Sequence, residues 1–258
     1  MDQTDKRIVF NLLKNGRVSQ RQIASDLGIS AQVLNYRMNK LIEDGIIKTF
    51  FLHVNPQIYG KMEEFAAFKT EKQYDGEISL KLNCLEEITL YGFVGTSREE
   101  LNQKIARATE VLGLPVMRYL PPPPKISMNI RDLDFKIIDL LKKDPRMSIS
   151  NIATALDVPY MSVKRRINLM EENRVIGVIT QVDLSGGELV LYSIFSNSVD
   201  SFFPSLAQST IFAIRDASAG FALCYADSLK TAKSSVTKVR EQDPGAEVMV
   251  LYDYEFYQ

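Results

Sequence analysis

Apolar side chains recur at helical spacing in three neighbouring stretches near the start of the chain. Residues 4–14, 20–27 and 31–43 each place their apolar positions on one face, which predicts three short helices. Ser19 and Ser30 stand directly before the second and third helices, where a hydroxyl accepts from free backbone N–H groups. Gly28 lies between these two helices and can adopt the left-handed conformation that ends a helix. The pattern therefore predicts a support helix followed by a helix-turn-helix.

The same pattern returns 129 residues later, which is half of the 258-residue chain. Residues 5–47 align with residues 134–176 without a gap and share thirteen identities. The identical pairs are Asp5/Asp134, Ile8/Ile137, Leu12/Leu141, Lys14/Lys143, Arg17/Arg146, Ser19/Ser148, Ile23/Ile152, Ala24/Ala153, Leu27/Leu156, Arg37/Arg166, Asn39/Asn168, Glu43/Glu172 and Ile47/Ile176. Such self-similarity indicates a tandem duplication.

The third helix of each copy has one apolar and one polar face. In the first copy we expect the apolar face to be Val33, Leu34, Met38 and Leu41, and the outward face to be Gln32, Asn35, Tyr36, Asn39 and Lys40. Two short helices joined by a tight turn, with hydrogen-bonding side chains on the second, are typical of a DNA-reading helix-turn-helix. An ordinary helical hairpin with a solvated face is the alternative. Two copies that keep the cap and the arginine pair Arg37/Arg166 favour the first interpretation.

These residues resemble a known family. The resemblance is to the winged helix of Lrp/AsnC-type transcription regulators, and it is carried by Leu27, Gly28, Ile29, Ser30, Val33, Leu34, Arg37, Met38, Leu41, Glu43, Gly45, Ile46 and Ile47. The resemblance implies a helix-turn-helix, a short wing and then a βαββαβ effector domain. The second copy departs from it at Asp157, Pro159 and Arg174, which replace the turn glycine, the capping serine and the late glycine.

The expected fold class is α+β, with two winged helix-turn-helix domains alternating with two ferredoxin-like (βαββαβ) effector-type domains in tandem duplication. We expect these domains at residues 1–55, 56–120, 131–182 and 183–258, with a proline-rich linker at 121–130 that contains the run Pro121 to Pro124. Residues 46–54 and 175–182 are rich in β formers and predict the wing strands.

The two α/β halves differ in their predicted elements. In the first half the pattern predicts strands at 64–70, 88–95 and 115–120 and helices at 75–84 and 98–112. This β-α-β-α-β order is one strand short of the family, so we interpret the first half as eroded. The second half keeps the full βαββαβ order, with strands at 188–195, 210–215, 221–226 and 247–254 and helices at 201–207 and 228–241.

The net charge of −1 becomes informative when it is divided along the chain. Residues 1–50 carry an excess of three positive charges and residues 130–180 an excess of two, so the remaining segments are acidic. Basic character is thus concentrated in the helical units, as a DNA-binding surface requires. Cys84 and Cys224 are isolated in the sequence, so we expect neither disulfides nor a metal site. The sequence has no apolar run of membrane-spanning length and no signal peptide, and we expect a cytoplasmic protein that does not bind membranes.

Candidate DNA-binding residues follow from the geometry of a recognition helix in the major groove. Base contacts are expected from Ala31, Gln32, Asn35 and Tyr36 in the first unit and from Tyr160, Ser162, Lys164 and Arg165 in the second. Phosphate contacts are expected from Arg17, Arg21, Lys40 and Arg146. For Arg37 and Arg166 the resemblance implies a backbone or structural contact. For each of these residues a solvated surface position is the alternative.

The resemblance also implies that the α/β halves bind a small effector, such as an amino acid. The matching glycine-containing connections are Tyr91, Gly92 and Gly95 in the first half and Ser218, Ala219 and Gly220 in the second. The simpler alternative is that they are ordinary turns. No resident cofactor is expected.

The sequence therefore predicts a transcription regulator whose partner is double-stranded DNA. One chain would form an intrachain pseudo-dimer with two non-identical recognition helices, and a homodimer of such chains remains open. An architectural or partner-binding winged-helix protein is one alternative. Some Lrp/AsnC-like proteins are sirohaem decarboxylases, but this chain has a single histidine, His53, and no second candidate base, so we expect no enzymatic activity.

Overall fold

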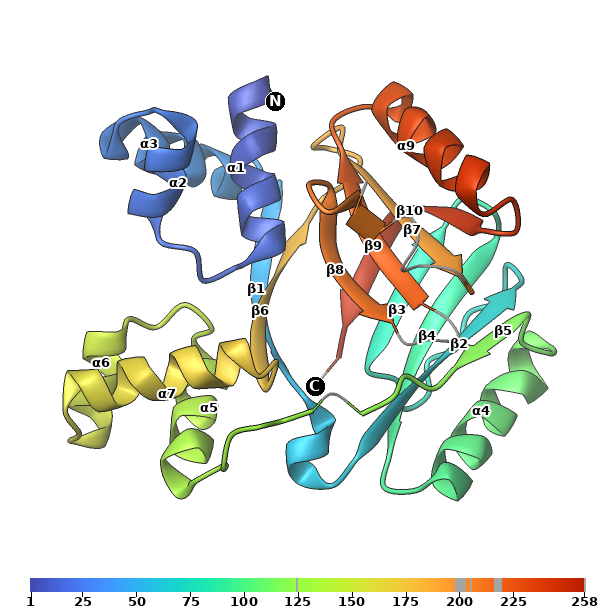
Figure 1. Ribbon diagram of the computed structural model, residues 1–258, viewed down its shortest axis with the longest axis horizontal. Coiled ribbons are helices and arrows are strands. Elements are labelled where there is room, and N and C mark those ends of the chain that lie inside the picture. Colours follow the sequence, from blue (N-terminus) through green and yellow to red (C-terminus); the bar gives the residue numbers. More distant parts are fainter. Residues whose placement is uncertain (124, 198–202, 205, 216–219, 258) are drawn as a thin grey trace.

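Two helical units lie next to one another along one side of the molecule, and a curved β-sheet with helices on its outside forms the other side (Figure 1). The computed structural model describes residues 1–258 except 124, 198–202, 205, 216–219 and 258. The first helical unit consists of α1 (Gln3–Lys14), α2 (Gln20–Leu27) and α3 (Ala31–Glu43). The second consists of α5 (Asp132–Lys143), α6 (Ile149–Leu156) and α7 (Tyr160–Glu172). The helix pattern read from the sequence is present in both units.

The tight turns have the same backbone conformation in both units although their residues differ. Gly28 ends α2 with φ 65°, and Asp157 ends α6 with φ 52°. Aspartate is one of the few residues that adopt this left-handed conformation readily, so the turn survives the loss of glycine. Pro159 at the start of α7 offers no side-chain acceptor, whereas Ser30 accepts from the Val33 N–H at 3.2 Å. The departures of the second copy therefore remove a cap but keep the turn.

The strand that follows each helix-turn-helix pairs with its counterpart in the other unit. β1 (Ile47–Val54) runs antiparallel to β6 (Ile176–Val182), with Phe51 opposite Ile179 and Phe50 opposite Thr180. This two-stranded ribbon carries one unit on each end. Because equivalent strands pair antiparallel, the two units are related by an approximate twofold axis through the ribbon.

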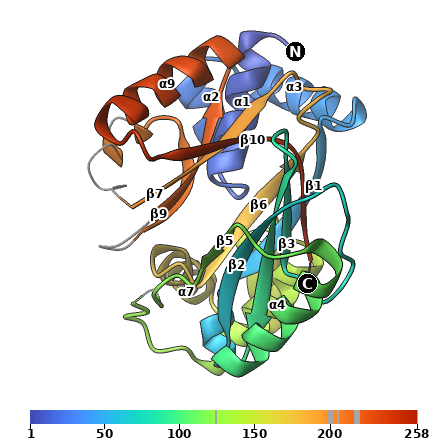
Figure 2. The same cartoon turned by 90° about the vertical axis from the view of Figure 1, so that its right-hand side faces the viewer.

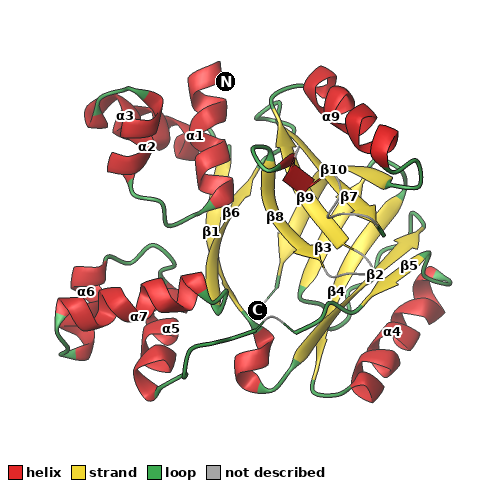
Figure 3. Ribbon diagram, in the orientation of Figure 1, coloured by secondary structure: helices red, strands yellow, loops and turns green. Residues whose placement is uncertain are grey.

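The α/β part is one eight-stranded sheet in the order β5-β2-β4-β3-β10-β7-β9-β8 (Figure 3). The first half supplies β2 (Met62–Lys69), β3 (Leu80–Cys84), β4 (Ile88–Gly95) and β5 (Met117–Tyr119). The second half supplies β7 (Val190–Ser196), β8 (Thr210–Arg215), β9 (Gly220–Ala226) and β10 (Glu247–Phe256). Helices α4 (Arg98–Leu112) and α9 (Leu229–Gln242) cover the outside of their own halves, at opposite ends of the sheet (Figure 2). Each half has the strand order 4-1-3-2 in its own numbering, as expected for a ferredoxin-like domain.

The helix predicted at residues 75–84 is wrong. The chain there forms a loop and then β3, so the first half has four strands and lacks a helix rather than a strand. The physical reason is visible in the alternation of Leu80, Leu82 and Cys84, which are all buried in the sheet. The loop covers the sheet in place of the helix, since the ring of Tyr74 packs edge-on against Tyr91 with centroids 6.2 Å apart. In the second half the predicted helix at 201–207 falls partly outside the described residues.

The two halves join where β3 pairs with β10, and β5 and β8 are the two ends of the described sheet. The register shows why the equivalent pairing of β5 with β8 does not form. Phe65 faces Tyr119 in the first half as Ile194 faces Val248 in the second, which preserves the offset of 129 residues. At that offset the run Pro121 to Pro124 occupies the positions at which β10 passes from β7 to β3. Proline has no N–H to donate to a neighbouring strand, so β5 is limited to three residues whereas β10 has ten.

The core is continuous from the first helical unit into the inside of the sheet, but the second unit has a separate core. Helix α1 packs on the second α/β half, where the Phe10 and Tyr225 rings stack at 4.7 Å and Lys6 Nζ donates to the Glu188 and Asp227 carbonyls. The second unit instead contacts β1 and the short helix η1 (Pro56–Tyr59). Among the described residues, none of the helices is long and apolar enough to span a lipid bilayer.

Candidate nucleic-acid interface

Helix α3 presents a polar, largely uncharged face to solvent. Its base-reading candidates Ala31, Gln32, Asn35 and Tyr36 are all exposed, and Tyr36 is 68% exposed. Leu34, Met38 and Leu41 are buried on the opposite face, as predicted. Val33 was predicted to face the core and does not, because its side chain is 44% exposed next to Gln32. It adds an apolar group that can contact a thymine methyl group.

Arg37 ties the recognition helix to the start of α1. Its Nη1 donates to Asp2 Oδ2 at 2.7 Å and to Asp5 Oδ1 at 2.8 Å. The two aspartates also form a capping box, in which each carboxylate accepts from the backbone N–H of the other. The bond from the Asp5 N–H, followed by the Arg37 guanidinium, lowers the pKa of Asp2. This cluster borders the exposed face of α3 in a shallow hollow that Gln32, Tyr36 and Lys40 also line.

Helix α7 presents a face of similar shape but different charge. Tyr160, Ser162, Lys164 and Arg165 are exposed, as expected of base-reading candidates. Met161 is 65% exposed at the start of the helix and was not selected from the sequence.

Arg166 occupies the position equivalent to Arg37 and is much more deeply buried. Its Nε donates to Asp134 Oδ1 at 2.6 Å, its Nη2 binds Asp134 Oδ2, and Nη2 also donates to the Asn129 carbonyl at 2.9 Å. Asp134 is fully buried, and its hydrogen bonds to Arg166 raise the pKa of that guanidinium. Arg37 and Arg166 therefore both anchor a recognition helix to its support helix.

The prediction that Arg17 and Arg146 contact phosphates is wrong, because both side chains join the two units to each other. Arg17 donates to the carbonyls of Pro145 at 2.7 Å and Met147 at 3.1 Å. Arg146 donates to the Val18 carbonyl at 3.4 Å and lies over the Phe50 ring. Since Arg17 and Arg146 are equivalent in the repeat, these contacts are reciprocal across the twofold axis. Burial lowers the pKa of both guanidinium groups.

The remaining phosphate candidates, Arg21 and Lys40, are exposed and available. The reciprocal arginine contacts and the β1–β6 ribbon together hold the two helix-turn-helix units in a fixed relation. Sequence reasoning missed this joint because its partners are backbone carbonyls about half the chain away.

The effector candidates in the first half are packed by the protein itself. Tyr91 is fully buried against Tyr74 and Phe93. A Cβ added to Gly92 would lie 2.5 Å from Ser79 Oγ, so this glycine permits the close approach of a neighbouring segment. Gly95 similarly packs on α4, where an added Cβ would meet the Leu101 side chain at 3.2 Å.

In the second half, Gly220 is the first residue of β9 and pairs with Ser196, while Ser218 and Ala219 lie outside the described residues. The first-half stretch thus has a structural role in the described fold.

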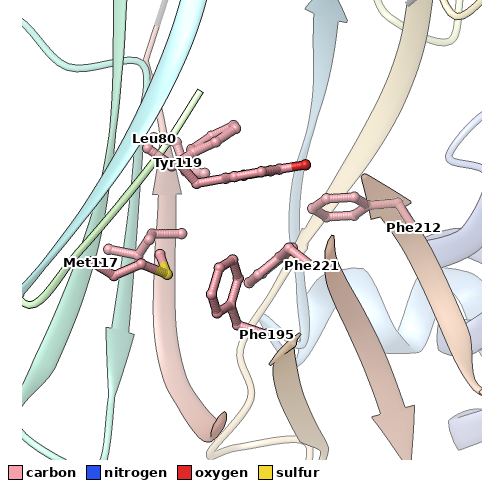
Figure 4. A pocket seen from close by; sticks show the side chains of 8 residues that line it. Leu80, Met117, Tyr119, Phe195, Phe212 and Phe221 are labelled. Carbon is pink, nitrogen blue, oxygen red and sulfur yellow. The ribbon is translucent and has the colours of Figure 1, made fainter. Parts of the chain in front are cut away.

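A small apolar cavity lies between the two α/β halves (Figure 4). Its volume is about 20 Å³, and its lining comes from both halves: Phe65, Leu80, Leu90, Met117, Tyr119, Phe195, Phe212 and Phe221. Figure 4 shows the Tyr119, Phe195 and Phe221 rings facing one another across it. A space of this size holds one small group, and its aromatic and aliphatic lining offers no charge to a polar ligand.

Comparison with known proteins identifies both helical units. A family model described as winged helix-turn-helix DNA-binding matches residues 1–48 and 130–176. An uncharacterised HTH-type transcriptional regulator of Pyrococcus furiosus is 32% identical over 93 residues, which cover 36% of this chain and 63% of the relative. The HTH-type transcriptional regulator FL11 of Pyrococcus abyssi, an Lrp/AsnC-family member, is 33% identical over 89 residues, or 34% of this chain and 59% of the relative. In both cases the matched segment spans less than two thirds of the relative.

Among solved structures, the siroheme decarboxylase NirDL is similar over 97% of this chain and 91% of its own, with a TM-score of 0.50 and 12% sequence identity. At that identity the likeness extends to the fold alone. It shows that the whole arrangement, with two helical units beside two joined α/β halves, occurs in another protein. The two matches to the family model lie in the helix-turn-helix units. The chain carries two winged helix-turn-helix DNA-binding units in one polypeptide, and it is similar in sequence to HTH-type transcriptional regulators of Pyrococcus.

Proposed function

We propose that the protein is a DNA-binding transcription regulator that presents two non-identical recognition helices, α3 and α7, to one stretch of double-stranded DNA. The observation that carries this proposal is the fixed pairing of the two units. The β1–β6 ribbon and the reciprocal Arg17 and Arg146 contacts place them side by side in one chain, along one side of the molecule (Figure 1). The exposed polar faces of both helices then remain free for base edges and phosphates.

The chain supplies within itself what regulators with one unit per chain obtain by pairing two chains. Because its two recognition faces differ in sequence, the preferred site is expected to be asymmetric rather than palindromic. The proposal requires neither an amino-acid effector nor a further homodimer. Of the effector candidates, Gly92 and Gly95 have structural roles in the first half. The protein is expected to act in the cytoplasm.

A siroheme decarboxylase activity is the alternative that the fold similarity raises. A tetrapyrrole is far larger than the 20 Å³ cavity between the α/β halves, and its acidic side groups need basic partners rather than the aromatic lining found there. His53 lies in the β1–β6 ribbon opposite Gly177, and burial lowers the pKa of its imidazole. We therefore favour the regulator and expect no decarboxylase activity.

The test is DNA binding by the full chain across a salt series, with duplexes from the protein's own upstream region and a scrambled duplex of equal length. The proposal expects log affinity to fall linearly with log salt, and the upstream duplex to bind about 10³-fold or more tightly than the scrambled one. Binding that depends on salt but not on sequence would instead support an architectural role. No binding at low salt would overturn the proposal, and a titration with sirohaem would then test the enzyme alternative.

A matched pair of variants identifies the surface. Lys164→Ala with Arg165→Ala removes two exposed charges from α7, and Lys230→Ala with Lys233→Ala removes two exposed charges from α9 on the opposite side of the molecule. Only the first pair is expected to weaken binding. An equal effect of both pairs would indicate a general dependence on net charge.

A further inference from the structure

The electrostatic environments of the two recognition helices differ at equivalent positions. At the offset of 129 residues, Asn35 corresponds to Lys164 and Tyr36 to Arg165, and all four side chains are exposed. The start of α7 is therefore more positive than the start of α3 by two charges. In the opposite direction, the exposed cations Arg21 of α2 and Lys40 near the end of α3 correspond to the neutral Ser150 and Leu169.

The corner beside each recognition helix increases the difference. In the first unit, Asp2 and Asp5 both bind Arg37, so two carboxylates face one guanidinium at the edge of the reading face. In the second unit Arg131 replaces Asp2, and its side chain is exposed, while Asp134 alone neutralises Arg166. Counted over side chains, the corner therefore carries a net charge of −1 beside α3 and is neutral beside α7, where Asp132 also lies.

Two more cations that the sequence places in these units do not reduce the asymmetry. Arg17 and Arg146 are both occupied at the joint between the units, so neither is available to balance the other surface. The start of α3 is a neutral hydrogen-bonding face of Gln32, Asn35 and Tyr36, with Val33 exposed beside it.

We propose that the two units divide the work of recognition: the second unit anchors the protein on DNA phosphates through Arg131, Lys164 and Arg165, and the first unit reads bases through Gln32 and Asn35. Phosphate contacts set affinity and its salt dependence, whereas amide side chains form paired hydrogen bonds with adenine in the major groove. The start of α3 therefore prefers A·T-containing sequence, and the base contacts of Gln32 and Asn35 depend weakly on salt. This inference rests on the proposed DNA-binding function.

The experiment uses the full chain and a duplex of about three helical turns from its own upstream region, with the scrambled duplex as reference. Lys164→Asn with Arg165→Tyr gives the second unit the residues of the first. On both duplexes it is expected to lower the slope of log affinity against log salt by about 2, because two phosphates are no longer neutralised. Gln32→Ala with Asn35→Ala is expected to leave that slope unchanged and to reduce the preference for the upstream duplex about 10-fold or more.

The variant Arg131→Asp distinguishes an effect of charge on DNA affinity from an effect of the substitution on stability. Asp2 caps α1 by accepting from the Asp5 N–H at 2.9 Å, and α5 has no such side-chain cap at Arg131. The Arg131→Asp variant can gain that cap, so its melting temperature is expected to stay level or rise while its DNA affinity falls. Asp2→Asn in the first unit keeps a capping side chain and removes one negative charge, and it is expected to raise affinity modestly on both duplexes.

The outcomes distinguish failure of the proposed DNA-binding function from failure of the proposed difference between the two units. Absence of wild-type binding at low salt would refute the proposed function itself. Wild-type binding combined with an unchanged salt slope in Lys164→Asn/Arg165→Tyr, or with a lowered slope in Gln32→Ala/Asn35→Ala, would leave DNA binding intact and overturn the division of work.

Discussion

Truncation of Asp134 tests how strongly burial raises the contribution of an ion pair to stability, by comparison of the buried pair Asp134–Arg166 with the equivalent, more exposed pair Asp5–Arg37. In the Asp134→Ala variant, Arg166 loses the partner of its Nε and Nη2 groups while its side chain is only 9% exposed. Breaking a buried pair by removing one member costs about 3–5 kcal/mol, because the remaining charge is left without compensation. In Asp5→Ala, Arg37 keeps Asp2 and is 29% exposed, so the expected cost is about 0–1 kcal/mol.

The comparison is matched because each variant also removes a carboxylate that accepts from a backbone N–H at a helix start. The difference between the two costs therefore reports the burial of the arginine. The assay is urea unfolding followed by circular dichroism, together with hydrogen exchange of the α5 and α7 amides, because the second unit has its own core and can unfold separately.

Adding Arg166→Met to Asp134→Ala removes the uncompensated charge, and this double variant is expected to recover most of the loss. If Asp134→Ala and Asp5→Ala lowered the free energy of unfolding by amounts that agree within about 1 kcal/mol, the reasoning would be refuted. Burial would then not determine how much these ion pairs contribute to stability.

Three further predictions concern the joint and the ribbon. His53 is the chain's one histidine, so its NMR titration is free of overlap. Burial lowers the pKa of its imidazole below the ordinary 6.5, so the contribution of His53 to stability is complete above pH 6.5 and is lost as the pH falls through the folded-state pKa. A titration midpoint at or above 6.5 would contradict this account. Gly16→Ala places a Cβ 2.7 Å from a backbone oxygen of β6, and we expect it to lower the free energy of unfolding by about 1–3 kcal/mol in a thermal melt. In the control Gly177→Ala the added Cβ meets no heavy atom within 4 Å, so the free energy of unfolding should change by less than about 0.5 kcal/mol. Equal costs would argue against a tight joint. Arg17→Ala leaves two carbonyls of the other unit without their donor, and we expect it to lower the free energy of unfolding in urea by about 1–3 kcal/mol. The control Arg21→Ala removes an exposed arginine and should change stability little. An unchanged stability of Arg17→Ala would refute the role of Arg17 in joining the units.

The helical units could be predicted from the sequence because their signals are local. The spacing of Ile23, Ala24 and Leu27, the caps at Ser19 and Ser30 and the repeat itself all concern residues close together in the chain or at one fixed offset. Such signals also placed the exposed face of α3 correctly, apart from Val33.

The joint between the units could not be predicted in this way. An arginine before a capping serine resembles a phosphate contact, and Arg17 finds its true partners among carbonyls that become neighbours only after folding. For residues 80–84 the signal was present but was misinterpreted. Leu80, Leu82 and Cys84 alternate as a strand requires, whereas residues 75–84 were interpreted as a helix.

The β1–β6 ribbon has a consequence for how such a protein responds to dilution and to mutation. Because the two strands belong to one chain, the pairing of the two units does not depend on protein concentration. In a dimer of identical chains each substitution is introduced twice, and both halves must tolerate it. Here Asp2 and Arg131 began as the same position of a duplicated unit and now carry opposite charges. Each half can thus acquire its own specificity without altering the other.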